Sequence, residues 1–154
     1  MQTKLTSLSL PEGITAIGND AFCGCKISSL TLPSSLKTIG ARAFSNNGIT
    51  QLTIPNKVES IGNAAFAHNS IGNIDFPATL VSLHATAFKW ESMNEVICRA
   101  LSVPQTPQTD EFNNSWRPFY QINENCVLKV PAESLTIYQQ AWEGYFQSVE
   151  TIQE

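Results

Sequence analysis

Apolar residues return along this chain at a constant interval of 22 positions, each time within the same short pattern. Every copy has an apolar residue, two variable residues and then a triplet with apolar first and third residues. The middle residue of the triplet is polar, and proline follows the triplet, in the first four copies. The first residue of the triplet is Leu8, Leu30, Leu52, Ile74 and Val96 in successive copies. A constant period in this range is typical of a solenoid, in which each repeat forms one coil and stacks on the next.

Within each repeat, the alternating triplet predicts a short strand with one buried face, and the proline predicts its end. A second apolar pair follows with three-residue spacing, at Ile14/Ile17, Leu36/Ile39, Val58/Ile61 and Leu80/Leu83. That spacing fits a short extended segment or a helical turn on the opposite wall of the coil. Glycine at positions 18, 40 and 62 then predicts a turn with positive φ or a close backbone approach. His84 occupies the fourth such position, where we expect local hydrogen bonding.

An Ala-Phe pair follows each turn, at 21/22, 43/44, 65/66 and 87/88. We expect the alanine to let neighbouring coils approach and the phenylalanine to fill the centre. Burial stabilises a coil by about 1.5–3 kcal/mol per large apolar side chain, but ordering its backbone costs about 1–2 kcal/mol per residue. A single coil therefore cannot fold alone, and stacking would align equivalent strands in a parallel sheet.

The register fades from Arg99, where three prolines and a polar majority predict an irregular connection over 99–125. Val127 to Val130 then predict a closing strand, ended by Pro131. From Glu133 or Ser134 onward, apolar residues fall at steps of 3 and 4 at Leu135, Tyr138, Trp142, Tyr145 and Val149. One apolar stripe of this kind predicts an amphipathic helix that caps the last coil.

Together, the strand-Pro, Ile-Gly and Ala-Phe motifs resemble the BspA-type leucine-rich repeat family, over Leu5 to about Arg99. The closing segment Leu128–Ser134, with Tyr138 and Trp142 after it, also looks like that family. The resemblance implies a β-dominated α/β leucine-rich-repeat solenoid with a C-terminal capping helix, as one domain over 1–154. Its repeats would be 5–26, 27–48, 49–70 and 71–92, with a degenerate fifth from 93 and a closing strand and helix over 126–154. His84 in place of glycine, and Arg99 in place of the fifth proline, depart from the pattern and put the geometry of the fifth coil in question.

Charged residues are only 14% of the chain, and the net charge is −4. Nine scattered basic residues argue against a nucleic-acid partner, which needs a clustered Lys/Arg footprint. The sequence contains no run of about 18 apolar residues, so it predicts no membrane-spanning helix. The N-terminus lacks the apolar core of a secretory signal. Since the first repeat opens within four residues of Met1 without a polar cap, we expect a fragment of a longer chain.

Candidate chemistry is sparse. His68 and His84 have no carboxylate or cysteine at the spacing of a known site, and no hydrolase or phosphate-loop motif occurs. Cys23-Gly-Cys25 suggests a metal or redox site, but redox pairs use two intervening residues and zinc needs further ligands. Cys98 and Cys126 could pair as a disulfide or remain free. We expect no catalytic residue, no metal site, no cofactor and no enzymatic activity.

The outward positions of the predicted strands form a mostly neutral hydroxyl- and amide-rich surface, which is the candidate binding site. It consists of Ser7, Ser9, Ser29, Thr31, Gln51, Thr53, Asn73, Asp75, Glu95 and Ile97. Solenoids use such faces for binding, although these residues also suit a solvated sheet. A secondary candidate is the aromatic group Trp116, Phe119 and Tyr120, which could form an exposed contact site or cover the end of the core.

These observations favour a non-enzymatic recognition module of a larger secreted bacterial protein, whose extracellular or cell-surface location and adhesive role are implied by the family resemblance. Its partner would be a protein or host-matrix ligand, or a glycan. One alternative is a structural spacer or assembly unit that self-associates through its uncapped first coil. Another is the accessory domain of an enzyme.

Overall fold

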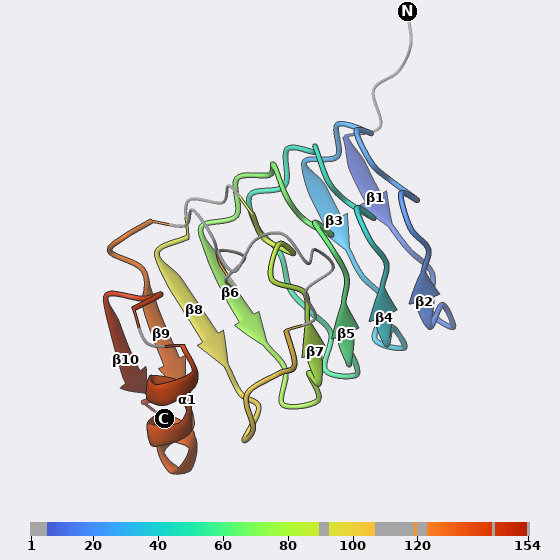
Figure 1. The fold of residues 1–154 in the computed structure, drawn as a ribbon. Helices are drawn as coiled ribbons and strands as arrows, with labels where there is room; N and C mark the ends of the chain where they lie inside the picture. The colour runs from blue at the N-terminus through green and yellow to red at the C-terminus, as the bar shows by residue number, and fades with distance from the viewer. Residues whose placement is uncertain (1–5, 90–92, 107–118, 120–122, 143, 154) are drawn as a thin grey trace, which may run out of the picture.

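The structure is a computed structural model that describes residues 6–89, 93–106, 119, 123–142 and 144–153. Its coils stack side by side in sequence order, so that the first and last strands lie at opposite ends of the stack (Figure 1). All strand pairs among these residues are parallel. The molecule is therefore a solenoid with parallel strands on each of two walls, as the 22-residue period predicts.

The front wall carries the first strand of the first, second, fourth and fifth repeats and the two closing strands, and its apolar column lies in register. Leu8 pairs with Leu30, and Val96 pairs with both Ile74 and Leu128. The strands join as β1-β3 and, separately, as β6-β8-β9-β10. Their bounds are β1 (Ser7–Ser9), β3 (Ser29–Thr31), β6 (Asn73–Phe76), β8 (Glu95–Cys98), β9 (Val127–Val130) and β10 (Ser148–Thr151).

The back wall is one sheet of two-residue strands. The sequence allowed either an extended segment or a helical turn at the second apolar pair of each repeat, and the structure shows an extended segment. The strands are β2 (Ala16–Ile17), β4 (Thr38–Ile39), β5 (Ser60–Ile61) and β7 (Ser82–Leu83), in that spatial order. Gln105 then forms a parallel bridge with Ser82. The fifth coil therefore reaches this wall, beyond Arg99, where the sequence predicts that the repeat register fades.

The phenylalanine of each repeat lies at the centre of its coil. The rings of Phe22, Phe44, Phe66 and Phe88 form one stack with centroids 5.4, 5.4 and 5.3 Å apart and planes within 14° of parallel. Offset stacking at this distance stabilises each ring pair by about 0.5–1.5 kcal/mol beyond burial alone. The stack is continuous through four coils, and its second, third and fourth rings are buried.

The turn after each back strand brings neighbouring coils into close contact at a glycine. A Cβ atom on Gly40 would lie 2.7 Å from backbone atoms of the preceding coil, and one on Gly62 would lie 2.9 Å from Ala41 N. Close approach is therefore the reason for glycine here. Positive φ occurs two residues later, at Asp20, Arg42 and Ala64 (φ 59°, 54° and 50°).

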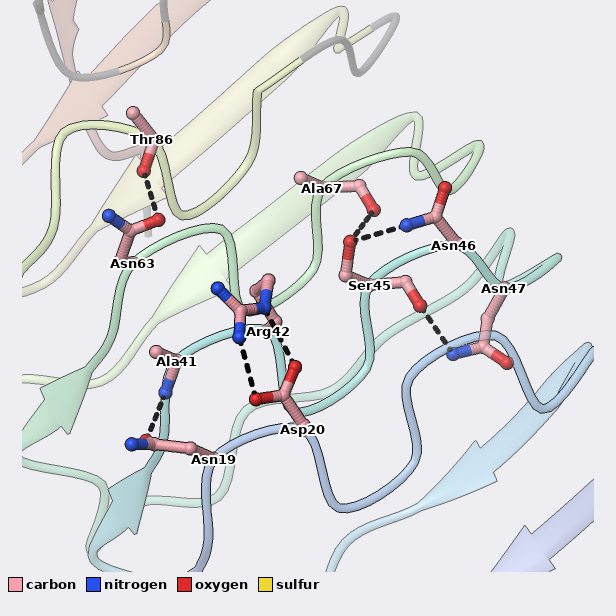
Figure 2. Close-up of polar contacts among 10 residues, drawn as sticks. All are labelled: Asn19, Asp20, Ala41, Arg42, Ser45, Asn46, Asn47, Asn63, Ala67 and Thr86. Atoms are coloured by element: carbon pink, nitrogen blue, oxygen red, sulfur yellow. Dashed lines mark hydrogen bonds and ion pairs between the residues drawn. The ribbon is translucent and has the colours of Figure 1, made fainter.

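Polar side chains also link these turns, as Figure 2 shows for coils one to four. Arg42 forms a bidentate ion pair with Asp20, at 2.7 and 2.8 Å. The Asn19 side-chain oxygen accepts a hydrogen bond from the Ala41 backbone (2.8 Å). In the fourth coil, His84 Nδ1 accepts from the Thr86 backbone N–H and lies 2.9 Å from the Thr86 hydroxyl, so the predicted local hydrogen bonding is present.

The C-terminal segment has a shorter helix than the apolar stripe predicts. A 3₁₀ turn (Ala132–Ser134) leads into α1 (Leu135–Ala141), and Gly144 with φ 76° redirects the chain into β10. The helical prediction is therefore wrong for Tyr145, which lies in a turn, and for Val149, which pairs with Leu128 as part of a strand. Tyr138 and Trp142 are buried, so the cap itself is present. No helix among the described residues is long and apolar enough to cross a membrane.

Candidate functional site

The front face, defined as the outward side chains of the front wall, collects the residues that the sequence proposes for binding. Ser7 lies beside Ser29, Ser9 beside Thr31, Asn73 beside Glu95, and Asp75 beside Ile97. Glu95 and Ile97 are half-buried, and the other eight candidate residues are exposed. The structure thus places all ten on one surface, in columns that cross the coils.

The third coil interrupts the sheet beneath this surface. Its segment Gln51–Ile54 keeps the predicted alternation, since Leu52 and Ile54 are buried while Gln51 and Thr53 are exposed. It nevertheless forms no strand, and no backbone hydrogen bond links residues 50–54 to either neighbouring coil within the part of the chain that the structure describes. The front wall is therefore divided into two sheets at the third coil. Backbone N–H and C=O groups of this segment are left available to solvent or to a ligand.

One groove opens on the second-coil side of this segment, with a volume of about 530 Å³. Its walls combine the candidate residues Thr31 and Thr53 with apolar surface from Leu32 and Ile54. Its polar residues also include Glu12, Ser34, Asn56 and Lys57. Apolar walls with a few hydrogen-bonding groups are typical of ligand-binding clefts.

A second groove, of about 270 Å³, opens on the fourth-coil side of the same segment. It shares Thr53 with the first groove and is bordered by Asp75 and Arg99. The Arg99 guanidinium donates to both Asp75 carboxylate oxygens, at 2.7–3.1 Å. This hydrogen bonding raises the pKa of Arg99. The pair fixes a polar border on the groove while leaving it close to neutral.

Of the two charged residues that line the larger groove, Glu12 is hydrogen-bonded and Lys57 has no ion pair among the described residues. Glu12 accepts hydrogen bonds from the Ser34 backbone N–H and hydroxyl, both at 2.9 Å, and these bonds lower the pKa of its carboxyl group. Lys57 forms no ion pair with any described residue. The groove therefore presents an ammonium group that remains available to an acidic partner.

Sequence reasoning missed the residues beyond the strand ends, namely Glu12, Asn56, Lys57 and Arg99. A signal was present, because Glu12, Ser34 and Asn56 each directly follow the proline that ends a predicted strand. Parallel strands end on the same edge, so residues after successive prolines gather in one place. Arg99, where the fifth proline is expected, belongs to the same edge.

Of the three residues of the secondary aromatic candidate, only Phe119 is among the described residues. Trp116 and Tyr120 lie outside the described residues. Phe119 is only 5% exposed, and its ring packs edge-on against Trp142 (5.5 Å) and beside Phe146 (5.2 Å). Phe119 therefore belongs to the core beneath the cap and offers no exposed contact surface.

The cysteines are free thiols. Cys98 is buried 3.2 Å from the Tyr138 hydroxyl, and burial raises its pKa. Burial likewise raises the pKa of Cys126 to about 11. Cys23 and Cys25 are half-buried in a turn, and no group of three metal-ligating side chains occurs among the described residues. What the described surface does offer is hydrogen-bonding and apolar contact.

This repeat architecture has an established counterpart. Residues 1–115 match the model of the BspA type leucine-rich repeat region, in six copies. The chain belongs to the BspA-type leucine-rich repeat family.

Two solved structures are similar to this chain, and the first of them shares its fold. The pneumococcal vaccine antigen PcpA is similar over 97% of this chain, with a TM-score of 0.71 at 20% identity. The chain spans only 36% of the length of that PcpA structure. A leucine-rich repeat protein from Bacteroides ovatus aligns over 94% of this chain and 54% of its own, with 18% identity and a TM-score of 0.36. No curated protein matches the sequence.

Proposed function

We propose that this BspA-type domain is a non-enzymatic recognition module that binds a protein partner through its front face, centred on the two grooves beside Gln51–Ile54. The observation that carries the proposal is the interruption of the sheet at the third coil. An unbroken sheet would present only side chains. The interruption adds unpaired backbone groups and two concave surfaces at the centre of the predicted binding face.

A protein partner suits this surface better than a glycan does. Unpaired backbone groups of an extended segment can pair with the backbone of an extended partner segment. The buried side chains Leu52 and Ile54 contribute apolar surface to the smaller groove. Lys57 provides a site for an acidic side chain at the border of the larger one.

In this proposal, the parent protein is secreted or lies at the bacterial cell surface. Support comes from the repeat family and from the fold shared with a pneumococcal vaccine antigen. The partner would then be a host-matrix or cell-surface protein, and the adhesive role follows from that location.

Binding to immobilised extracellular-matrix proteins, together with a glycan array, tests the proposal. We expect Thr53→Lys to weaken binding to a protein at least tenfold with an unchanged melting temperature, because a longer charged side chain would fill both grooves. Thr38→Lys is the matched control, since Thr38 is an exposed threonine on the back sheet. Equal loss in both variants, binding to glycans alone, or binding that survives Thr53→Lys would contradict the proposal.

A further inference from the structure

The second coil ends in the one Asn-Gly dipeptide of the sequence, Asn47-Gly48. The backbone nitrogen of a residue that follows asparagine can attack the Cγ atom of the asparagine side chain. Glycine hinders this attack least, because it has no Cβ atom and the widest range of backbone conformations. Every other asparagine of the sequence precedes a residue that carries a Cβ atom. In the unfolded chain, Asn47 is therefore the asparagine most open to this reaction.

The fold ties both reacting groups to Ile27, at the start of the same coil. The Gly48 N–H donates to the Ile27 carbonyl at 2.8 Å, and Asn47 Oδ1 accepts from the Ile27 N–H at 2.9 Å. Attack requires that the Gly48 nitrogen lose its proton and approach Asn47 Cγ. Both hydrogen bonds oppose these changes, so the reaction needs them to break.

The leaving group is held as well. Asn47 Nδ2 donates to the carbonyls of Phe22 and Phe44 at 2.9 Å each and to the Ser45 carbonyl at 3.2 Å, the contact drawn in Figure 2. Phe22 belongs to the first coil, whereas Phe44 and Ser45 belong to the second. Release of the Asn47 amide therefore requires the first two coils to separate at this turn.

We infer that Asn47-Gly48 is a masked deamidation site, which becomes reactive when the second coil opens away from the first. The Gly48 nitrogen then forms a bond to Asn47 Cγ while the Cγ–Nδ2 bond breaks, and the proton of the Gly48 nitrogen leaves with the ammonia. One water molecule hydrolyses the resulting cyclic imide. Cleavage at Cγ gives aspartate, and cleavage at the backbone carbonyl of residue 47 gives isoaspartate. The reaction needs water alone and is independent of the proposed ligand.

Either product prevents the two coils from closing as before. An aspartate carboxylate only accepts hydrogen bonds, so it would face the Phe22 and Phe44 carbonyls without a donor. Isoaspartate adds an atom to the backbone of a coil whose length is fixed by the 22-residue period. The modification therefore converts a transient opening between the first two coils into a permanent one.

Peptide mass spectrometry of the full chain, incubated at mildly alkaline pH with and without urea, tests the inference. In urea, we expect Asn47 to deamidate several times faster than Asn69, which is followed by Ser70. Without urea, Asn47 should deamidate at least tenfold more slowly than in urea, because only locally opened molecules react. Equal rates at Asn47 in the two conditions, or a rate in urea no faster than that of Asn69, overturn the inference.

Two variants separate the chemistry from the opening. Gly48→Ala should slow the reaction in urea at least tenfold and leave the fold intact, since its Cβ atom would make only ordinary contacts, at 3.7 Å or more. Gly40→Ala should instead speed the reaction without urea, because its Cβ atom would press on Asn19 in the first coil. A Gly40→Ala chain that melts at a lower temperature but deamidates at the wild-type rate would overturn control by this pair of coils.

Asn47→Asp measures the consequence of the modification. This variant should melt at a lower temperature than Asn56→Asp, the matched control, because the Asn56 side chain is exposed. Equal melting temperatures would overturn the conclusion that the product keeps the coils from closing.

Discussion

A Cβ atom on Gly40 would lie 2.7 Å from the backbone nitrogen of Asn19 in the preceding coil, closer than real Cβ contacts come. The two coils are held at this separation by the Gly40 N–H, which donates to the Ile17 carbonyl at 2.9 Å. Neither backbone can move away without breaking that bond. The glycine column therefore sets the distance between coils.

We predict that Gly40→Ala lowers the free energy of unfolding by about 1–3 kcal/mol, the usual cost of forcing extra volume into a packed site. Gly48→Ala is the control. Its Cβ atom would lie 3.7 Å from the nearest atom, and its φ lies outside the left-handed region, so it should be neutral or stabilise by about 0.4–1 kcal/mol. Urea denaturation measures both. Equal effects would show that close approach does not explain the glycine.

Asn47 joins the first two coils through its side-chain amide. Its oxygen accepts from the Ile27 N–H, and its nitrogen donates to the carbonyls of Phe22 and Phe44, each at 2.9 Å. We predict that Asn47→Ala costs about 1–3 kcal/mol of stability, since it leaves partly buried backbone groups unpaired. Asn56→Ala should change stability by less than about 0.5 kcal/mol, because Asn56 is exposed. Thermal and urea denaturation would contradict this explanation if the two variants were equally stable.

The Tyr138 hydroxyl fixes the cap to the fifth coil. It lies 3.1 Å from the Ala100 carbonyl and 3.2 Å from the Ser102 carbonyl, and it can donate to either. Tyr138→Phe should destabilise the protein by about 1–3 kcal/mol, because it leaves buried acceptors without this donor. Thr136→Ala, on the exposed side of α1, should have little effect. Urea denaturation measures both, and a Tyr138→Phe variant as stable as wild type would show that another group satisfies these carbonyls.

The buried thiol of Cys126 predicts an alkaline loss of stability. Its pKa is raised from 9.0 to about 11 by burial, so the folded chain keeps this proton at a pH where the unfolded chain has lost it. The contribution of Cys126 to stability is therefore fully present below pH about 9 and is lost between pH about 9 and 11. Cys126→Ala should be less stable at pH 7, because it leaves a cavity, but should lose less stability across this window. An unchanged slope in urea titrations would rule out this thiol as a source.

Much of the solenoid follows from the sequence because its period is constant. Leu8, Leu30 and Leu52 identify one wall, and the Ala-Phe pairs identify the centre. The interruption at Gln51–Ile54 could not be predicted, because this segment has the same alternation as its neighbours. Alternation determines which side chains face inward, whereas hydrogen bonding depends on the separation of adjacent backbones.

Two other features show what a one-dimensional pattern can and cannot resolve. Val149 falls at a helical step from Tyr145, but α1 ends at Ala141, before both residues, and β10 pairs with β9 instead. Asn47 and Asn69, by contrast, are 22 residues apart and follow the phenylalanine by three, so a polar column was visible.

The even spacing of the phenylalanine rings has a consequence for how such a protein can change in size. Deleting or duplicating one complete unit, such as 27–48, would bring the same glycine, ring and asparagine positions together again. An insertion of a single residue inside a strand would instead turn its apolar side chains toward solvent. The distance that the molecule reaches along its axis can therefore be altered only in whole increments, each close to the 5.3–5.4 Å that separates the rings.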